Sequence, residues 1–208
     1  KETVESFGDV SEIMTQVHES KDAPNPETDK RFRMSDMENT DLSGAKLSNF
    51  DFSMSSLAGT NFDGAELRGA KFKASALNGA SFVGADLSDA NFAASDMQNA
   101  NFTKANMAKT KFTSSAFKGA TFTGAVFDHT VFKTCDLENL NLNGVIFRGT
   151  VFDKTSCKDT TFDGAVFEDV TFHYSDPRKA IFAGAKMDKI TYAGLKGMKA
   201  NLEGVTVA

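Results

Sequence analysis

The chain has 208 residues, a formal net charge of −5, 20 Phe, 16 Gly and no Trp. This length suits one domain or two small ones, and the composition differs from that of an ordinary globular mixture. No window approaches 18 consecutive apolar residues, so no transmembrane helix is predicted. The two cysteines, Cys135 and Cys157, are too few for a disulfide framework or a zinc cluster.

The compartment is not fixed by these features. A chain with two cysteines suits any compartment and slightly favours a reducing one, such as the cytoplasm. The N-terminus has no basic segment followed by an apolar run, so no secretory signal is predicted in this sequence. Because the chain begins at Lys1 rather than at Met, an upstream targeting segment that has been removed is compatible with it.

Residues 1–31 form the first predicted unit. Val10, Ile13, Met14 and Val17 follow helical spacing, which predicts a short amphipathic helix over residues 9–20. Residues 21–30, KDAPNPETDK, are typical of a polar linker interrupted by proline. Two roles are open for the helix. The favoured interpretation is that it caps the first coil of the following repeats and blocks edge pairing. The alternative is that it binds a partner or directs targeting.

Residues 32–208 form the second predicted unit, and a period of five residues runs through it. Stepping in fives from Leu42 to Phe172 gives 27 positions, of which 26 are Leu, Phe or Met; the exception is Cys157. Two residues before each of these central residues, the chain is nearly always Ala, Ser, Thr or Val. The register extends outward to Phe32 and to Val207. Such spacing matches neither a strand nor a helix.

Two inward positions in every five residues allow a corner at each repeat, so four repeats would close a coil of twenty residues. Residues twenty apart should then stack. One column is entirely aromatic: Phe52, Phe72, Phe92, Phe112, Phe132, Phe152, Phe172 and Tyr192. Another is glycine from Gly44 to Gly204, with Lys104 as its exception, which indicates a turn with positive φ.

The tandem motif resembles the pentapeptide-repeat family. Ala85-Asp86-Leu87, Ala90-Asn91-Phe92 and Ala100-Asn101-Phe102 carry the A-[DN]-[LF] pattern, and the resemblance covers about residues 32–207. It implies an all-β fold, a right-handed quadrilateral parallel β-helix whose four walls are short parallel sheets. About nine coils would place the central Leu and Phe side chains on the axis, preceded by the short N-terminal helix.

The C-terminal end is expected to continue the coil. Residues 200–208, ANLEGVTVA, keep the register and show no helical cap, which predicts an open strand edge. A homodimer through this edge is one way to protect it. Upstream, Pro177 occupies a central position and cannot donate a ladder hydrogen bond, so a local bulge or a loosened corner is expected there.

No catalytic, cofactor-binding or metal-binding residues are predicted. His18, His129 and His173 are scattered, and no phosphate loop or nucleophile motif is present. Asp96, Asp136 and Asp176 share a column, but two coils, or about 10 Å, separate each pair, which is too far for one metal ion. Cys135 and Cys157 take inward positions on the same wall and are expected to be buried thiols; a disulfide between them is the less favoured alternative.

The outward charges alternate along several columns, for example Asp128, Arg148 and Glu168, which predicts self-neutralising ladders. Some pentapeptide-repeat proteins imitate DNA and protect type II topoisomerases, and such mimicry needs a strongly negative face. Residues 1–31 hold 8 acids and 4 bases, whereas the remainder holds 20 acids and 19 bases. The loop insertions and C-terminal dimerisation helix of such proteins are also not expected here. Binding and protection of DNA gyrase or topoisomerase IV is therefore the second hypothesis.

A β-branched surface patch carries the first hypothesis. Five residues just before the central position should point outward on two adjacent walls: Val126, Val131, Ile146, Val151 and Val166. Either they only favour extended backbone, or they form a surface for a protein partner or for self-association. The sequence therefore predicts a non-enzymatic scaffold that binds a protein of unknown identity, with no nucleic-acid partner, no cofactor and no membrane span. Alternatively, the partner is a second copy of the chain, which would form a homodimer through this lateral patch.

Overall fold

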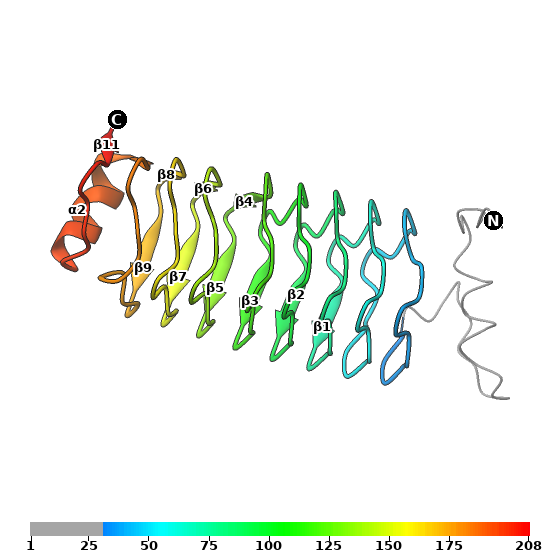
Figure 1. The fold of residues 1–208 in the computed structure, drawn as a ribbon. Helices are drawn as coiled ribbons and strands as arrows, with labels where there is room; N and C mark the ends of the chain where they lie inside the picture. The colour runs from blue at the N-terminus through cyan, green and yellow to red at the C-terminus, as the bar shows by residue number, and fades with distance from the viewer. Residues whose placement is uncertain (1–30) are drawn as a thin grey trace, which may run out of the picture.

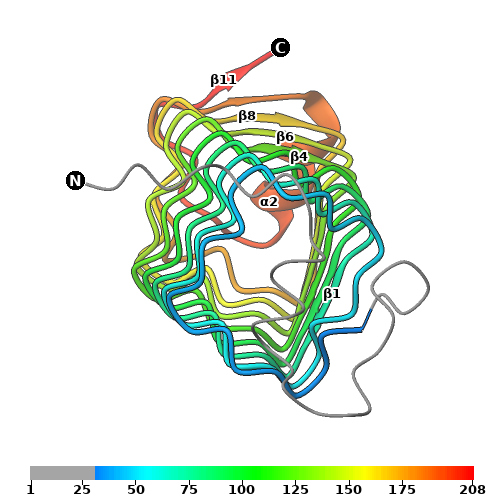
Figure 2. The same cartoon turned by 90° about the vertical axis from the view of Figure 1, so that its right-hand side faces the viewer.

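The computed structural model describes residues 31–208. The predicted helix and linker within residues 1–30 lie outside the described residues. The described chain is an all-β parallel solenoid, in which each residue that pairs has its partner twenty positions along the sequence (Figure 1). Seen along the axis, successive coils superimpose, so the period of twenty residues is confirmed (Figure 2). The right hand, the four-sided section and the count of nine coils stay predictions.

Two sheets run along the solenoid, and all their strands are short and parallel. The six-stranded sheet, called the β1 sheet, consists of β1 (Lys71–Lys73), β2 (Asn91–Ala93), β3 (Lys111–Thr113), β5 (Val131–Lys133), β7 (Val151–Asp153) and β9 (Thr171–His173). The five-stranded sheet, called the β4 sheet, consists of β4 (Val126–Asp128), β6 (Ile146–Arg148), β8 (Val166–Glu168), β10 (Lys186–Met187) and β11 (Thr206–Val207). Elsewhere the coils are joined through single parallel bridges, such as Asp41 with Asn61.

Whether a wall forms a short strand or a single bridge depends largely on the residue before the central one. Where it is Asp or Asn, its side chain usually accepts a hydrogen bond from the N–H two residues ahead, as Asp86 does from Ser88 at 3.0 Å. This Asx turn bends the backbone directly after the bridge. In the same wall Val126 begins β4, because a β-branched side chain offers no acceptor and favours extended backbone.

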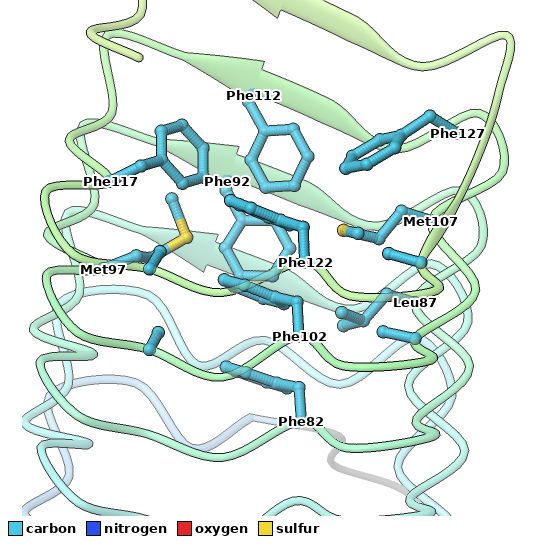
Figure 3. Close-up of a cluster of buried hydrophobic side chains, with 14 of the residues drawn as sticks. Phe82, Leu87, Phe92, Met97, Phe102, Met107, Phe112, Phe117, Phe122 and Phe127 are labelled. Atoms are coloured by element: carbon cyan, nitrogen blue, oxygen red, sulfur yellow. The ribbon is translucent and has the colours of Figure 1, made fainter. Parts of the chain in front are cut away.

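The core is a set of ring stacks along the axis. In the predicted aromatic column, Phe72, Phe92 and Phe112 stack at centroid distances of 4.7 and 5.0 Å. A second column contains Phe82 and Phe102, and Figure 3 shows it beside Phe92 and Phe112. The column members from Phe52 to Phe152 are buried, as predicted. Phe172 is only partly buried, because the coil that should cover it is replaced by a helix.

The small inward residues also join neighbouring coils. Their hydroxyl groups donate hydrogen bonds to backbone carbonyls 23 residues earlier, as Thr110 does to Leu87 and Thr130 to Met107, each at 2.7 Å. A larger side chain at this place would enter the ring stacks, whereas Ala leaves the carbonyl with its backbone donor alone. The Ala, Ser, Thr or Val at this position is therefore set by space and by a hydrogen bond together.

The glycine column lies at turns with positive φ, as predicted. Gly84 has φ +66° and Lys104, the exception in the column, has φ +59°. A Cβ at Gly84 would meet no atom within 4 Å, so backbone conformation rather than space disfavours a side chain there.

Changing Gly84 to Ala should therefore lower the free energy of unfolding by about 1 kcal/mol, the usual cost of the left-handed region for an L-residue. The matched control is Gly194→Ala, because Gly194 lies in a helix and also has open space around its Cβ position. That change should raise stability by about 1 kcal/mol. Chemical denaturation measures both variants; an equal effect at the two sites would contradict this account of the turn.

The C-terminal prediction was wrong in one respect, because a helix interrupts the coil. Helix α2 (Lys189–Gly197) takes the place of the next strand of the β1 sheet, and Tyr192 belongs to this helix rather than to the aromatic column. The chain nevertheless returns in register, since Lys186 pairs with Thr206 and Met187 with Val207. The spacing of twenty residues is therefore unchanged where a helix replaces a strand. For this reason the period alone did not reveal helix α2.

Helix α2 lies at the C-terminal end of the solenoid (Figure 1), where polar contacts fix it on the last coil. Asp188 caps the helix by accepting from the N–H groups of Ile190 and Thr191, and it also accepts from the N–H of Asp169 at 2.8 Å. Burial raises the pKa of Asp188, but hydrogen bonds from the Thr191 hydroxyl and from these N–H groups outweigh that effect and hold the pKa below its ordinary value. The Thr191 hydroxyl accepts from the N–H of Val170 at 3.1 Å. The helix therefore occupies backbone donors at the end of the solenoid.

The expected irregularity at Pro177 is present. Asn139 donates its N–H to Lys158, nineteen residues ahead, whereas the equivalent N–H of Asp159 donates to Lys179, twenty residues ahead. The acceptor thus moves by one residue in the coil that contains Pro177. The change stays local, because Thr161 still pairs with Ile181.

Candidate protein-binding surface

The β-branched residues form two columns on two sheets. On the β4 sheet, Val126, Ile146 and Val166 pair in register; on the β1 sheet, Val131 pairs with Val151. Val126 is 45% exposed and Ile146 is 40% exposed, while the other three are half-buried. The most accessible apolar surface of the predicted patch therefore lies on β4 and β6.

The glycine turns shape the surface beside these two residues. Gly124 and Gly144, which have no side chains, line a groove of about 130 Å³ together with Val126, Ile146 and Arg148. The absence of a side chain at each turn leaves one flank of Val126 and Ile146 uncovered. Sequence reasoning identified the glycine column and the valine column separately but did not place them side by side.

Charged residues border this groove. Arg148 donates from Nε to Glu168 Oε2 at 2.7 Å, the ion pair expected between neighbouring coils, and Asp128 contacts the ring of His129 at 2.6 Å. Since all four side chains are at least partly exposed, the pairs add little stability. They instead give the apolar centre a polar rim, the usual anatomy of a protein interface.

Charges also alternate in two other columns, Lys133 with Asp153 and Lys118 with Glu138 and Lys158, but no direct ion pair joins their members within residues 31–208. Glu138 accepts from the Ser156 hydroxyl at 2.7 Å, and the carboxylate nearest Lys158 is that of its neighbour Asp159 at 3.9 Å. Register in these columns therefore depends on the backbone ladder and the ring stacks rather than on charge.

The two valine columns belong to different sheets. Along the chain, Asp128 and the turn at His129 separate Val126 from Val131, and Arg148 and the turn at Gly149 separate Ile146 from Val151. A partner that covers both columns must therefore also cover a charged strip. We call Val126, Ile146 and the groove beside them the Ile146 surface. Whether Val131, Val151 and Val166 extend it stays a prediction.

The described residues contain no group of three or more metal-ligating side chains in position to hold a metal ion. Asp96, Asp136 and Asp176 each form an Asx turn with the residue two positions ahead, so their column has a local structural role. Arg178 holds the pKa of the exposed Asp176 carboxyl at about 2 through hydrogen bonds.

Both cysteines are buried and unbridged. Burial raises the pKa of Cys135 to about 11 and that of Cys157 to about 12. Each therefore carries a proton at neutral pH, and a thiol in this form is a poor nucleophile and a poor metal ligand. The prediction that both are buried thiols is confirmed.

Two family models match the chain. The pentapeptide repeat region model matches residues 76–142, and the model of pentapeptide repeats in eight copies matches residues 35–73 and 131–169. A comparison with curated proteins finds no match. Among residues 31–208, no helix is long and apolar enough to cross a membrane.

Two solved structures share the fold. QnrB1, a plasmid-mediated fluoroquinolone resistance protein, has a TM-score of 0.70 and 16% identity, over 83% of this chain and 91% of its own. HetL, a pentapeptide repeat protein involved in heterocyst differentiation regulation from the cyanobacterium Nostoc sp. strain PCC 7120, has a TM-score of 0.55 and 19% identity, over 88% of this chain and 87% of its own. At such identities the likeness concerns the fold alone.

Proposed function

We propose that this chain, which belongs to the pentapeptide-repeat family, is a non-enzymatic scaffold that binds another protein through the Ile146 surface. The observation that carries the proposal is the exposure of Val126 and Ile146 beside a groove with a charged rim. We also propose the right-handed, four-sided form with about nine coils that the family resemblance implies. Such a rod offers separate walls to separate partners.

The backbone under this surface supports the proposal. Val126 and Ile146 lie on paired strands whose central residues, Phe127 and Phe147, are buried and stacked at 5.3 Å. A surface held in this way loses little conformational freedom when a partner covers it, which reduces the cost of binding. Removing the exposed part of two β-branched side chains from water then favours the complex.

The test uses the full chain as bait in an extract of its host cells. Ile146→Asp should reduce capture of the partner by at least about tenfold, because a carboxylate cannot be desolvated in the apolar centre. Ile181→Asp is the matched control, since Ile181 occupies the equivalent position on another wall and is 48% exposed. Val151→Asp tells whether the second column takes part. Equal capture by Ile146→Asp and by the unmodified chain would contradict the proposal.

A second copy of the chain is an alternative occupant of the Ile146 surface. Sedimentation velocity of the purified chain distinguishes the two cases. Self-association would give a dimer whose fraction rises with protein concentration, whereas a chain that binds only a different protein would remain a monomer. A dimer that Ile146→Asp dissociates would identify the patch as a self-association surface. A dimer that persists in this variant would direct attention to the C-terminal end, where Val207 on β11 is 42% exposed.

Protection of a type II topoisomerase is the second candidate function. The observation in its favour is the likeness in fold to QnrB1. The near-neutral balance of residues 32–208, with 20 acids and 19 bases, argues against it. Gyrase supercoiling and its poisoning by a quinolone are the assays. No effect of micromolar protein in either assay would eliminate this function.

A further inference from the structure

Basic side chains are concentrated on one wall of the solenoid. We call the basic wall the exposed face of the β1 sheet and of the earlier coils that continue it through the bridges Arg31–Asp51 and Asp51–Lys71. Its outward positions hold seven basic and two acidic side chains, whereas the rest of residues 31–208 holds 13 basic and 18 acidic ones. The basic residues are Arg31, Arg33, Lys71, Lys73, Lys111, Lys133 and Lys154. The near-neutral total therefore hides a strongly one-sided distribution.

The N-terminal half of this wall is also hollowed. A groove of about 450 Å³, larger in volume than the groove at Ile146, is lined by Arg33, Asp51, Met54, Lys71 and Lys73 together with small side chains such as Ala74 and Ala93. Small alanine side chains leave space between the longer basic ones. The groove thus combines cationic groups with one large apolar side chain, since Met54 is 45% exposed.

The carboxylates within this wall do not neutralise it. Asp51 accepts from the N–H of Ser53 at 3.0 Å and its nearest cation is Arg33 at 3.9 Å. Lys71 and Lys73 form no ion pair with any residue in 31–208. Two lysines on one strand repel each other, so an anionic group that covers both is favoured.

The chain itself carries a matching anionic segment. Residues 1–30 contain eight acidic and three basic residues, a net charge of −5 against +5 on the basic wall. The segment joins the solenoid at Arg31, on the basic wall itself, and Lys71 lies two coils further along, or about 10 Å. A tether this short gives an effective concentration in the millimolar range, so weak contacts suffice. The segment also contains apolar residues, including Val10, Ile13 and Met14, that could contact Met54.

We infer that the acidic segment of residues 1–30 docks in cis on the basic wall, over the groove that contains Lys71 and Lys73. The contact is electrostatic, with an apolar contribution at Met54, and it shields the wall from anionic molecules in solution. This placement differs from a cap over the first coil, and it is independent of the Ile146 surface on the β4 sheet.

Zero-length carbodiimide crosslinking of the full chain tests the inference, because it joins a lysine amine to a carboxylate only when the two are in contact. Mass spectrometry should find Lys71 or Lys73 joined to acids of residues 1–30. The yield should fall by about tenfold near 1 M salt, where the screening length is about 3 Å. Lys46, which lies in the first coil on another wall, reports the alternative cap. Crosslinks to Lys46 with none to Lys71 or Lys73 would overturn the inference.

Charge-reversal variants give a second, more specific test. Lys71→Glu with Lys73→Glu removes the two reactive amines and serves as the starting point for a reversed pair, whereas the control pair Lys118→Glu and Lys158→Glu, on another wall, should leave the crosslinks of Lys71 and Lys73 unchanged. Adding Glu27→Lys and Asp29→Lys to the first pair should restore crosslinks of reversed polarity. A mixture of isotopically heavy and light chains distinguishes contact in cis from contact in trans. Crosslinks mainly between heavy and light chains, or no crosslinks of reversed polarity in the fourfold variant, would refute docking in cis.

Discussion

Replacing Phe112 with Ala should lower the free energy of unfolding by about 3–5 kcal/mol, the usual cost of deleting a fully buried ring. Phe112 is fully buried, stacks on Phe92 at 5.0 Å and on Phe132 at 5.1 Å, and meets Phe117 edge-on at 5.1 Å. The cavity would open in the middle of the stack, with the rings of Phe92 and Phe132 on either side held by backbone ladders. Figure 3 shows Phe112 beside Phe92 and Phe117. Little collapse is possible there, so the loss should be near the upper end of this range.

The position in the solenoid gives the control. Phe172→Ala removes the same group from the same column, but Phe172 is only partly buried and has a ring stacked on one face. Its cost should be clearly smaller, at about 1–2 kcal/mol, because less area is returned to water. Chemical denaturation followed by circular dichroism measures both. Equal losses for the two variants would contradict a continuous stack whose interior members are covered on both faces.

Replacing Leu195 with Ala should cost about 2–4 kcal/mol and loosen the C-terminal helix. Leu195 is 1% exposed and is part of the apolar core, whereas Ile190 of the same helix is 75% exposed. The groove between α2 and β9, lined by Phe172, Leu195 and Met198 among others, shows where the helix meets the sheet. Ile190→Ala is therefore the matched control and should change stability by less than about 0.5 kcal/mol.

The loosened helix has a second consequence. When α2 leaves β9, the backbone of that strand becomes an open edge, which other chains can pair with. Leu195→Ala should thus increase concentration-dependent association, detected by light scattering, while Ile190→Ala should not. A destabilised Leu195→Ala variant that remains monomeric at all concentrations would show that α2 contributes packing without protecting the edge.

The sequence was sufficient to predict the repeat because a large apolar side chain recurs at nearly every central position and a small one two residues before it. Each Phe of the aromatic column marks the central position of its repeat, and each Gly of the glycine column marks a turn. Helix α2 was missed since the residues from Lys186 to Thr206 number the same as one full coil, so the period continued across it. The signals that could have revealed it are Asp188 followed by Thr191, an N-cap pattern, and Gly197, which stands where the repeat requires a large apolar residue.

The candidate surfaces were harder to predict from the sequence than the repeat was. Val126 and Ile146 could be assigned to the outside from their position before a central Phe, but the groove beside them depends on how two coils align Gly124 and Gly144. The basic wall was overlooked because alternation was judged column by column along the chain. Lys71 and Lys73 add to Arg33 only when the coils are stacked and one face is counted as a whole.

Radical footprinting of the complex with the captured partner tests the proposed binding surface most directly, because it reports solvent access of individual apolar side chains. Val126, Ile146, Ile181 and Ile190 are all exposed in the free chain and serve as probes on different parts of the molecule. The account predicts that oxidation of Val126 and Ile146 falls on binding while Ile181 and Ile190 react as before. Protection of Ile181 or Ile190, with Val126 and Ile146 still reactive, would contradict it.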